Sequence, residues 1–315
     1  MLSKGISVVI PVYKSAQCIR ELTNRLFSVL SQSGDPFEVI FVNDKSPDNS
    51  WDIIAQLSRE KSNIAGINLM YNSGQHCALL AGIRYAHYDT IVTMDDDLQH
   101  PPEEIPKLLN QLSQGYDVVY GIPRVLPHGT FRNFSSKFIK LCLSITMNSN
   151  IAQQVSAFRA FRASLKNVFA DFRSPCPCID VLLTWGTRNF TSVQVEHEPR
   201  KCGKSNYSFL KLIIHTLNMA TGYSTLPLRL ASLLGFFFTF MGLLVLLYVM
   251  GRYFISGNPV AGFPFLASII AIFSGAQLFV FGIFGEYLAR MYVRIMDRPG
   301  YIIQEIKDNR NLSHS

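Results

Sequence analysis

Two long stretches without a charged residue constrain this chain more than any other feature of its sequence. They run from Leu230 to Met250 and from Asn258 to Gly285. Each is long enough to cross the hydrocarbon core of a bilayer as a helix, which takes roughly 20 apolar residues. A buried helix of a soluble domain is rarely so long and so apolar. We therefore expect two transmembrane helices, at about 229–251 and 260–285, which form a hairpin within residues 226–290.

Basic residues around these stretches predict how the hairpin is oriented. Four arginines stand at its outer ends, namely Arg229, Arg290, Arg294 and Arg298, whereas the loop between the stretches carries only Arg252. Because Lys and Arg are enriched in cytoplasmic loops, both ends of the hairpin are expected in the cytoplasm. We expect the same of a C-terminal tail at 291–315 and of the N-terminus, which leads into a strand pattern without an apolar signal segment. The sequence thus predicts a multi-pass membrane protein with both termini in the cytoplasm.

The part before the hairpin, residues 1–225, alternates between strand and helix patterns. Short β-branched runs predict strands, and helical spacing of apolar residues predicts helices between them; the strands are expected at 6–10, 37–42, 65–70 and 90–94, and the helices at 18–30, 51–59 and 75–86. This alternation implies an α/β fold with a doubly wound, mostly parallel sheet. Ligands of such sheets bind beyond the carboxyl ends of the strands. Pro11, Asp44 and Asp95 each follow a predicted strand, so we expect them to meet in one crevice.

Two segments of this part combine basic and apolar residues at helical spacing. Residues 131–147 place Arg132, Lys137 and Lys140 beside apolar side chains, and residues 208–220 repeat the pattern more weakly. Such juxtamembrane amphipathic helices suit a membrane surface, although an ordinary surface helix has the same pattern. The net charge is +7, and there is no recognised nucleic-acid motif. We therefore attribute the charge to anionic lipid and phosphate ligands and expect no nucleic-acid partner.

Three consecutive carboxylates, Asp95, Asp96 and Asp97, follow the last of these predicted strands. Like charges this close repel one another unless a cation or a proton compensates for them. Mg²⁺ or Mn²⁺ would do so and would also bind substrate phosphates. Alternate residues of an extended segment share one side, so Asp95 and Asp97 are the expected metal ligands, whereas Asp96 points elsewhere. An acidic, solvated loop is the alternative interpretation.

A second polar cluster, Asn43 to Ser46, ends another predicted strand. The carboxylate of Asp44 could accept a hydrogen bond from the N–H of a nucleobase or from a ribose hydroxyl. The pattern is unspecific by itself, because Asn, Asp and Ser are common turn residues.

A basic, glycine-containing segment, Arg200 to Tyr207, precedes the membrane hairpin. Arg and Lys bind phosphate through charge, and glycine lets backbone amides approach it. Arg200, Lys204 and Ser205 are therefore candidate phosphate-binding residues. A juxtamembrane loop that contacts anionic lipid headgroups is the alternative, and the two interpretations overlap if a lipid phosphate is the substrate.

Taken together, these motifs resemble glycosyltransferase family 2, in particular its polyprenyl-phosphate glycosyltransferase branch. The resemblance covers almost the whole chain and lies in residues 8–13, 42–50, 72–76, 94–104, 159–162, 200–209, 227–229 and 285–290. It implies a cytoplasmic domain of the GT-A type that binds a UDP- or dTDP-linked sugar and transfers the sugar to undecaprenyl phosphate. Homo-oligomers are known for similar proteins.

The resemblance also implies roles for individual residues. Donor nucleotide would lie against Pro11, Tyr13, Asp44 and Asp95, and the metal and the diphosphate would lie at Asp95 and Asp97. The basic segment that begins at Arg200 would receive phosphate from the donor or the acceptor.

Some positions depart from the family pattern, and one of them concerns catalysis. The family has an Asp, proposed as catalytic base, where this chain has Gln153. The candidate catalytic residues are therefore Asp97, Asp96 and Asp180, and Asp180 could instead be a structural, hydrogen-bonded carboxylate. A base is not strictly required, because a phosphate monoester with a second pKa of about 6 is mostly dianionic at neutral pH.

These observations lead to the hypothesis of an inverting, metal-dependent transfer of a sugar to a lipid phosphate. A polysaccharide-forming synthase is the first alternative, disfavoured because two membrane spans are few for a polymer channel. A nucleotide-sugar-binding membrane protein without catalysis is the second, motivated by the departures at Ser15, Asn43 and Gln153.

Overall fold

The computed structural model describes residues 3–124, 154–170, 172, 177–199, 225–256 and 262–309. The chain divides into two compact units, which we describe separately. The first combines Met1–Phe209 with Asp297–Ser315, and the second is Leu210–Met296. Both predicted amphipathic segments, 131–147 and 208–220, lie outside the described residues.

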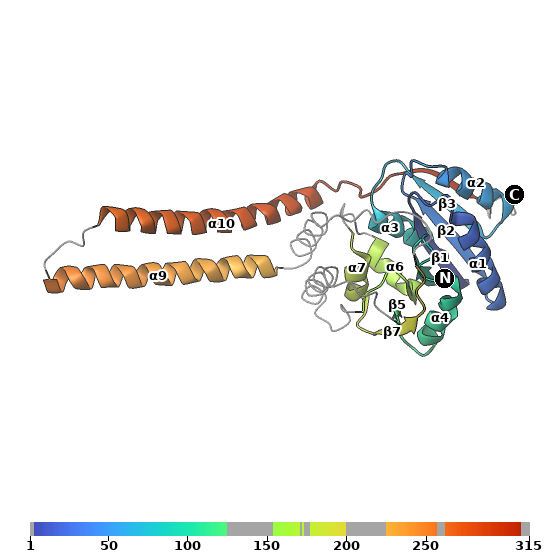
Figure 1. Cartoon of the computed structure of the whole chain (residues 1–315), viewed down its shortest axis with the longest axis horizontal. Helices are drawn as coiled ribbons and strands as arrows, with labels where there is room; N and C mark the ends of the chain where they lie inside the picture. The colour runs from blue at the N-terminus through green and yellow to red at the C-terminus, as the bar shows by residue number, and fades with distance from the viewer. Residues whose placement is uncertain are drawn as a thin grey trace. The chain divides into compact units, whose positions relative to one another are not determined.

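One mixed, mostly parallel sheet forms the centre of the first unit (Figure 1). Its strands are β1 (Ser3–Val12), β2 (Phe37–Asn43), β3 (Ile64–Leu69), β4 (Tyr88–Thr93), β5 (Val118–Pro123), β6 (Arg159–Arg162), β7 (Phe190–Val195) and β8 (Ile303–Asp308). Their order across the sheet is β7-β5-β6-β4-β1-β2-β3-β8. Strands β3, β2, β1 and β4 run parallel, as do β5 and β7, while β6 and β8 pair with their neighbours antiparallel. The predicted doubly wound, mostly parallel sheet is confirmed.

Helices cover both faces of this sheet. They are α1 (Ile19–Gln32), α2 (Ser50–Glu60), α3 (Gln75–Tyr85), α4 (Ile105–Ser113), α6 (Lys166–Ala170) and α7 (Ile179–Gly186), with short 3₁₀ turns η1 (Pro102–Glu104) and η3 (Ala163–Leu165). Successive residues of a strand point to opposite faces. Accordingly, Ile10 packs in one core cluster with α1 and α4, and Val9 packs in the other with α3 and α7.

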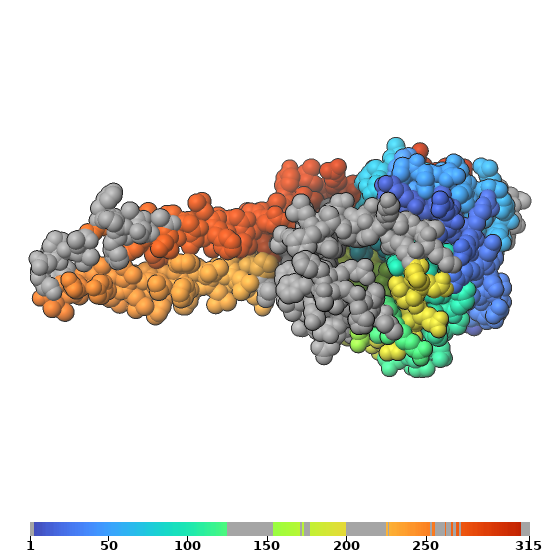
Figure 2. Space-filling view, viewed as in Figure 1, coloured from blue at the N-terminus to red at the C-terminus, as the bar shows by residue number. Residues whose placement is uncertain are grey.

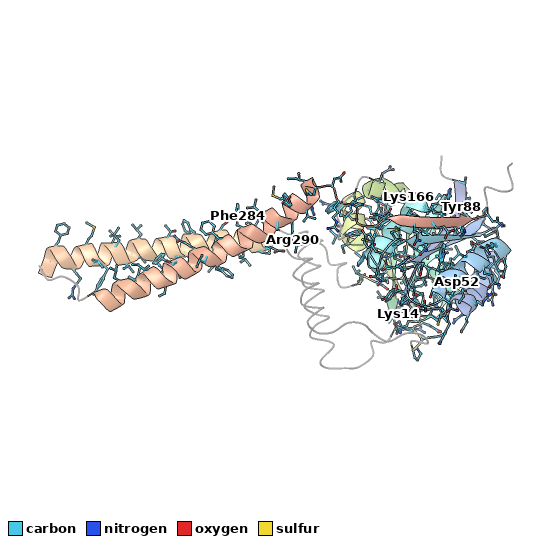
Figure 3. All side chains as sticks on the ribbon, turned by 90° about the horizontal axis from the view of Figure 1, so that it is seen from above. Lys14, Asp52, Tyr88, Lys166, Phe284 and Arg290 are labelled. Carbon is cyan, nitrogen blue, oxygen red and sulfur yellow. The ribbon has the colours of Figure 1, made fainter. Side chains whose placement is uncertain are left out.

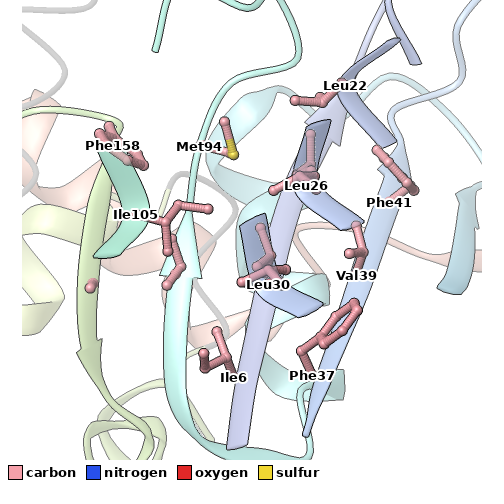
Figure 4. Close-up of a cluster of buried hydrophobic side chains, with 14 of the residues drawn as sticks. Ile6, Leu22, Leu26, Leu30, Phe37, Val39, Phe41, Met94, Ile105 and Phe158 are labelled. Atoms are coloured by element: carbon pink, nitrogen blue, oxygen red, sulfur yellow. The ribbon is translucent and has the colours of Figure 1, made fainter. Parts of the chain in front are cut away.

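The apolar face of α1 shows how sequence pattern becomes packing. Leu22, Leu26 and Leu30 recur at helical spacing and are buried, and Figure 4 shows them facing Val39 and Phe41 of β2. Burying one such leucine contributes about 1.5–3 kcal/mol. On the opposite face, α3 lies close to the sheet, because a Cβ at Gly82 would be 2.4 Å from Cγ1 of Val9.

The chain returns to the sheet after the hairpin. Strand β8 pairs antiparallel with β3, with Ile306 opposite Ile67, and forms the edge of the sheet. The Tyr301 hydroxyl accepts a hydrogen bond from Arg84 of α3 at 3.1 Å. The segment predicted as a tail therefore contributes a strand to the sheet of the first unit.

The second unit contains two long helices, α9 (Leu226–Ser256) and α10 (Phe263–Ile295). Both are long and apolar enough to cross a membrane, over Pro227–Arg252 and Ile272–Ile295. They lie side by side (Figures 1 and 2), and the Phe238 and Phe273 rings meet edge to face at 6.0 Å. Apolar side chains such as Phe284, labelled in Figure 3, remain exposed. Both helices agree with the predicted hairpin, although α10 extends beyond the predicted end at 285.

Candidate active site

The carboxyl ends of three parallel strands bring the predicted site residues of the described chain together. Pro11 of β1 lies opposite Val42 of β2. The Asp44 amide donates to the Val12 carbonyl at 3.0 Å, and the Met94 amide donates to the Val9 carbonyl at 3.3 Å. Pro11, Asp44 and the acidic segment Asp95–Asp97 therefore lie at the same, carboxyl edge of the sheet.

Asp96 turns toward β1. Its Oδ2 accepts a hydrogen bond from the Tyr13 amide at 3.1 Å. Burial raises the pKa of Asp96 to about 6, and repulsion from Asp97 adds to this, although hydrogen bonds from the Ser15 hydroxyl and the Tyr13 amide oppose it. Asp96 thus ties the acidic segment to the loop that follows β1.

Asp95 and Asp97 have different surroundings. Asp95 is partly exposed, and its Oδ1 accepts a hydrogen bond from Nε2 of Gln75, at the start of α3, at 2.6 Å. Asp97 is buried, and its Oδ1 accepts one from the Gln99 amide at 3.0 Å. This turn needs a left-handed backbone at Leu98, whose φ is +60°, an uncommon conformation for a non-glycine residue.

The chemistry of this donor set fits a hard divalent cation. Mg²⁺ is usually held by one or two carboxylates together with substrate phosphates rather than by a complete protein cage. Within residues 3–124 and the other described segments, no group of three His, Cys, Asp or Glu side chains is arranged to hold a metal ion. A cation held by Asp95 and Asp97 would therefore need ligands beyond the described side chains, and the phosphate oxygens of a substrate are of the right kind.

Asp44 organises the neighbouring loop. It is buried, and its two oxygens accept hydrogen bonds from the amides of Ser73 at 2.6 Å and Gly74 at 2.9 Å. Burial raises the pKa of Asp44, and these two amides counteract the increase. A carboxylate has about four acceptor positions, so Asp44 retains capacity for a donor ligand. Because Gln75 follows this loop directly, Asp44 also helps to place the side chain that contacts Asp95.

Two lysines in the loops after β1 and β2 have left-handed backbones, Lys14 with φ +59° and Lys45 with φ +51°. The Lys14 amide donates to Oγ of Ser46 at 2.7 Å, which joins the loops after β1 and β2. Lys14 is labelled in Figure 3. The side chain of Lys45 donates from Nζ to Oε1 of Gln304 in β8 at 2.9 Å. The C-terminal strand therefore contacts a loop of the candidate site.

Asp180 lies in a buried ion pair. Arg159 donates from one Nη to Asp180 and from Nε to Oγ1 of Thr93 at 3.0 Å. The Tyr120 hydroxyl donates to the same Asp180 oxygen at 3.1 Å. This geometry favours the structural role that the sequence left open for Asp180. Since Thr93 ends β4, the cluster supports the strand that carries the acidic segment.

The segment after β7 lies against the acidic segment. The Glu198 amide donates to the Gln99 carbonyl at 2.9 Å, and the rings of His197 and His100 meet edge to face at 5.1 Å. These contacts join residues about a hundred positions apart, so no local sequence pattern could have revealed them. The predicted basic segment follows at Arg200.

Three predicted phosphate-binding residues, Arg200, Lys204 and Ser205, lie outside the described residues, as does Gln153, where the family has an Asp. Their roles stay predictions. Two residues that the sequence did not single out, Gln75 and Gln99, contact Asp95 and Asp97.

Comparison with known proteins gives the chain relatives over most of its length. Residues 7–169 match the model of the family described as Glycosyl transferase family 2. The undecaprenyl-phosphate 4-deoxy-4-formamido-L-arabinose transferase of Pectobacterium carotovorum subsp. carotovorum (strain PC1) is 34% identical over 305 residues, which cover 96% of this chain and 93% of the relative. The enzyme of the same name from Pseudomonas fluorescens (strain SBW25) is 33% identical over 308 residues, which cover 97% and 90%.

Among solved structures, glucosyl-3-phosphoglycerate synthase from Mycobacterium tuberculosis, in complex with Mn²⁺, uridine diphosphate and phosphoglyceric acid, is similar with a TM-score of 0.51. The match covers 69% of this chain and 76% of the other at 16% sequence identity. At this identity the likeness is one of fold alone.

Proposed function

The chain belongs to glycosyltransferase family 2, and from this premise we propose that it transfers a sugar from a nucleotide to a polyprenyl phosphate at the membrane surface. The observation that carries the proposal is the acidic segment Asp95–Asp97, which contacts Tyr13 and lies at the same sheet edge as Asp44 in a chain that also has two membrane-length helices. The relatives named as undecaprenyl-phosphate transferases match over nearly the whole chain and support undecaprenyl phosphate as the acceptor.

For the donor, we propose a UDP- or dTDP-linked sugar whose nucleoside lies against Pro11, Tyr13 and Asp44. A buried carboxylate with remaining acceptor capacity suits the N–H of a pyrimidine base. Uridine diphosphate in the solved structure of similar fold is consistent with this choice.

For the cofactor, we propose that Asp95 and Asp97 hold Mg²⁺ or Mn²⁺ together with the donor diphosphate. A divalent cation at this place would neutralise the negative charge that develops on the leaving diphosphate. The structure with Mn²⁺ and uridine diphosphate supports a divalent cation in this fold in general. The protein's own contribution is to fix both carboxylates through Gln75 and Gln99.

The reaction that we propose inverts the anomeric carbon. An oxygen of the lipid phosphate attacks that carbon, the bond from the carbon to the diphosphate oxygen breaks, and the nucleoside diphosphate leaves. No proton has to move, because the phosphate monoester is already mostly dianionic at neutral pH. Arg200, Lys204 and Ser205 would bind the phosphate of the donor or of the acceptor. The scheme gives Asp180 a structural role rather than that of a base, which the ion pair of its carboxylate with the buried Arg159 supports.

The topology supports a cytoplasmic location for both termini. Strands β1 and β8 belong to one sheet, although α9 and α10 lie between them in the sequence. A chain that leaves a folded domain and returns to it crosses a membrane an even number of times. Two crossings satisfy this condition, and the arginines at the outer ends of the hairpin favour the cytoplasm for those ends.

A transfer assay tests this function. Purified protein in detergent is mixed with undecaprenyl phosphate, Mn²⁺ or Mg²⁺ and a panel of radiolabelled UDP- and dTDP-sugars, and the label extracted into organic solvent is counted. We expect lipid-phase label with at least one donor, and none when undecaprenyl phosphate is omitted or the cation is chelated. If no donor of the panel labels the lipid, the protein is not the transferase that we propose.

A further inference from the structure

A continuous series of contacts joins helix α1 to Asp97. Nη2 of Arg25 donates to Oε1 of Glu198 at 3.3 Å. The Glu198 amide donates to the Gln99 carbonyl at 2.9 Å, and the Gln99 amide donates to Oδ1 of Asp97 at 3.0 Å. The peptide groups before and after Gln99 therefore each make a hydrogen bond, and the series of contacts ends at the carboxylate of Asp97.

Arg25 makes this series possible by joining two acidic side chains. It donates to Glu103 from Nε at 2.9 Å and from Nη2 at 2.6 Å, in addition to its bond to Glu198. Two carboxylates that share one site repel each other unless a cation lies between them. Hydrogen bonding to Glu103 raises the pKa of Arg25 further, so the guanidinium stays charged. The charge of Arg25 thus offsets the repulsion between Glu103 and Glu198.

Two further contacts join the segment after β7 to the segment that follows Asp97. The Glu196 amide donates to Oε2 of Glu104 at 3.2 Å. The His100 ring stacks on Phe158 at 5.2 Å and meets His197 at 5.1 Å, and its buried Nδ1 has no hydrogen-bond partner in the described part of the chain. Ring packing thus contributes to the orientation of His100, and the ion pairs of Arg25 add a charged contact between the same segments.

We propose that Arg25 is a positioning residue for the Asp95–Asp97 site, acting through Glu198 and Gln99 on Asp97. The inference rests on the proposed sugar transfer, and it adds a residue of helix α1 to the groups on which that reaction depends. Arg25 does not touch substrate in this scheme. It holds Glu198 and Gln99 in place and thereby keeps the carboxylate of Asp97, which would be a ligand of the cation, in a fixed orientation.

If Arg25 only stabilised the fold, its replacement would affect activity and stability differently than the positioning role predicts. Arg25 is 21% exposed, Glu198 37% and Glu103 51%, and ion pairs this accessible to solvent contribute little to folding. A misplacement of a reacting group by about 1 Å, in contrast, can slow a reaction about 10²-fold. The positioning role therefore predicts a large change in activity with a small change in thermal stability.

The first test compares Arg25→Met with Arg20→Met. Arg20 lies on the same helix and makes one exposed hydrogen bond, to Oε1 of Gln56 at 2.7 Å, so it is a matched control. We expect kcat/KM of transfer to fall about tenfold or more in R25M. We expect it to stay within about twofold in R20M, with melting temperatures of both variants within about 2 °C of wild type. A rate in R25M equal to that of R20M would overturn the proposal.

The second test asks whether Arg25 acts through Glu198. Glu198→Gln removes the charge that Arg25 compensates and leaves the backbone amide that contacts Gln99. Because both substitutions interrupt one connection, the double variant R25M/E198Q should transfer sugar no more slowly than R25M alone. If the rate losses of R25M and E198Q multiplied in the double variant, the two residues would act independently. That result would contradict the proposed route through Glu198.

The third test does not depend on activity. In metal-free protein, the amides of Gln99 and Glu198 should exchange with deuterium faster in R25M than in R20M or wild type, because their acceptors are no longer held. Unchanged exchange at both amides would overturn the positioning role even if the transfer assay succeeds. Absence of transfer by wild-type protein would instead count against the proposed function and leave this measurement valid.

Discussion

At the scale of single residues, three adjacent carboxylates have three different surroundings. Asp95 is partly exposed and bonded to Gln75, Asp96 turns to the Tyr13 amide, and Asp97 is buried with the Gln99 amide. Alternation along an extended segment predicted that Asp96 would point away from its neighbours. It could not predict the partners of each carboxylate, because these come from other loops.

Asp97→Asn tests the metal-binding assignment. The substitution keeps the shape of the side chain and removes a charged ligand, so we expect transfer to fall about 10²-fold or more and to need much higher concentrations of Mn²⁺. Asp52→Asn is the matched control, since Asp52 is an exposed residue of α2 (Figure 3). Wild-type activity and cation dependence in Asp97→Asn would refute the assignment.

Asp180→Asn separates a structural role from a catalytic one. Removing one partner of a buried ion pair leaves Arg159 uncompensated, so the unfolding free energy should fall by about 3 kcal/mol. Tyr120→Phe removes only one hydrogen bond to Asp180, and about 1 kcal/mol should be lost. Both values come from denaturant titration. An Asp180→Asn protein that is as stable as wild type but inactive would instead support a role as base.

Asp48 should make the stability of the loops after β1 and β2 depend on pH. Partial burial raises the pKa of Asp48, but hydrogen bonds from Ser46, Ser50 and Ala16 outweigh burial and lower it. A carboxyl whose folded pKa is lowered contributes stability above its unfolded pKa of about 3.9 and loses it as pH falls through the folded value.

The corresponding measurement is the melting temperature of wild type and Asp48→Asn between pH 7 and pH 3. Wild type should be more stable by up to about 1 kcal/mol at pH 7, a modest amount because the side chain is exposed to solvent. The difference should shrink below about pH 4. A difference that stays constant down to pH 3 would show that the charge of Asp48 is not involved.

At the scale of elements, residue periodicity predicted the parts that local sequence determines. Strands β1 to β4 and helices α1 to α3 lie within a few residues of their predicted positions, because β-branched runs and helical spacing are local signals. Strand β6, Arg159–Arg162, has only four residues and begins and ends with arginine, so its sequence shows no strand pattern. Its pairing with β4 and β5 and the Arg159–Asp180 contact arise only from tertiary packing.

Strand β8 is another element that the sequence did not reveal. Its residues, Ile303–Asp308, alternate weakly and include three charged side chains, which is typical of an exposed edge strand. Its position is determined by β3, a strand more than two hundred residues earlier, and by contacts such as Lys45 with Gln304.

Deleting residues 297–315 tests the importance of β8. Five paired positions with β3 are lost, and at a few tenths of a kcal/mol each the unfolding free energy should fall by about 2 kcal/mol or more. For a domain of this size that lowers the melting temperature by about 4–8 °C. Deleting residues 310–315 alone, which follow β8, is the control and should have no effect. Equal stability of both deletions would mean that β8 does not support the sheet.

At the scale of the whole molecule, the hairpin is an insertion within the sequence of one folded domain. Composition predicted α9 and α10 well, because length and apolarity are local properties that a membrane span requires. That the chain returns to the sheet after α10 could not be read from composition. The prediction of a homo-oligomer belongs to this scale too and stays a prediction.

Cysteine labelling tests the proposed orientation of the hairpin. In a variant without native cysteines, Ile255→Cys places a thiol near the end of α9, where Ile255 is 87% exposed, and Arg59→Cys places one on α2. In cells whose envelope outside the cytoplasmic membrane has been made permeable, a membrane-impermeant maleimide should label Ile255→Cys and not Arg59→Cys. Labelling of both positions, or of Arg59→Cys alone, would contradict two crossings with cytoplasmic termini.

The central claim is that one sugar is transferred to one lipid phosphate, and mass spectrometry of the lipid product tests it most directly. Undecaprenyl phosphate should gain the mass of a single glycosyl residue for each nucleoside diphosphate released, and Asp97→Asn should give no such product. Free sugar with unmodified lipid would indicate hydrolysis, and a ladder of added residues would indicate a polymer-forming synthase. Either result would contradict the transfer of a single sugar to the lipid phosphate.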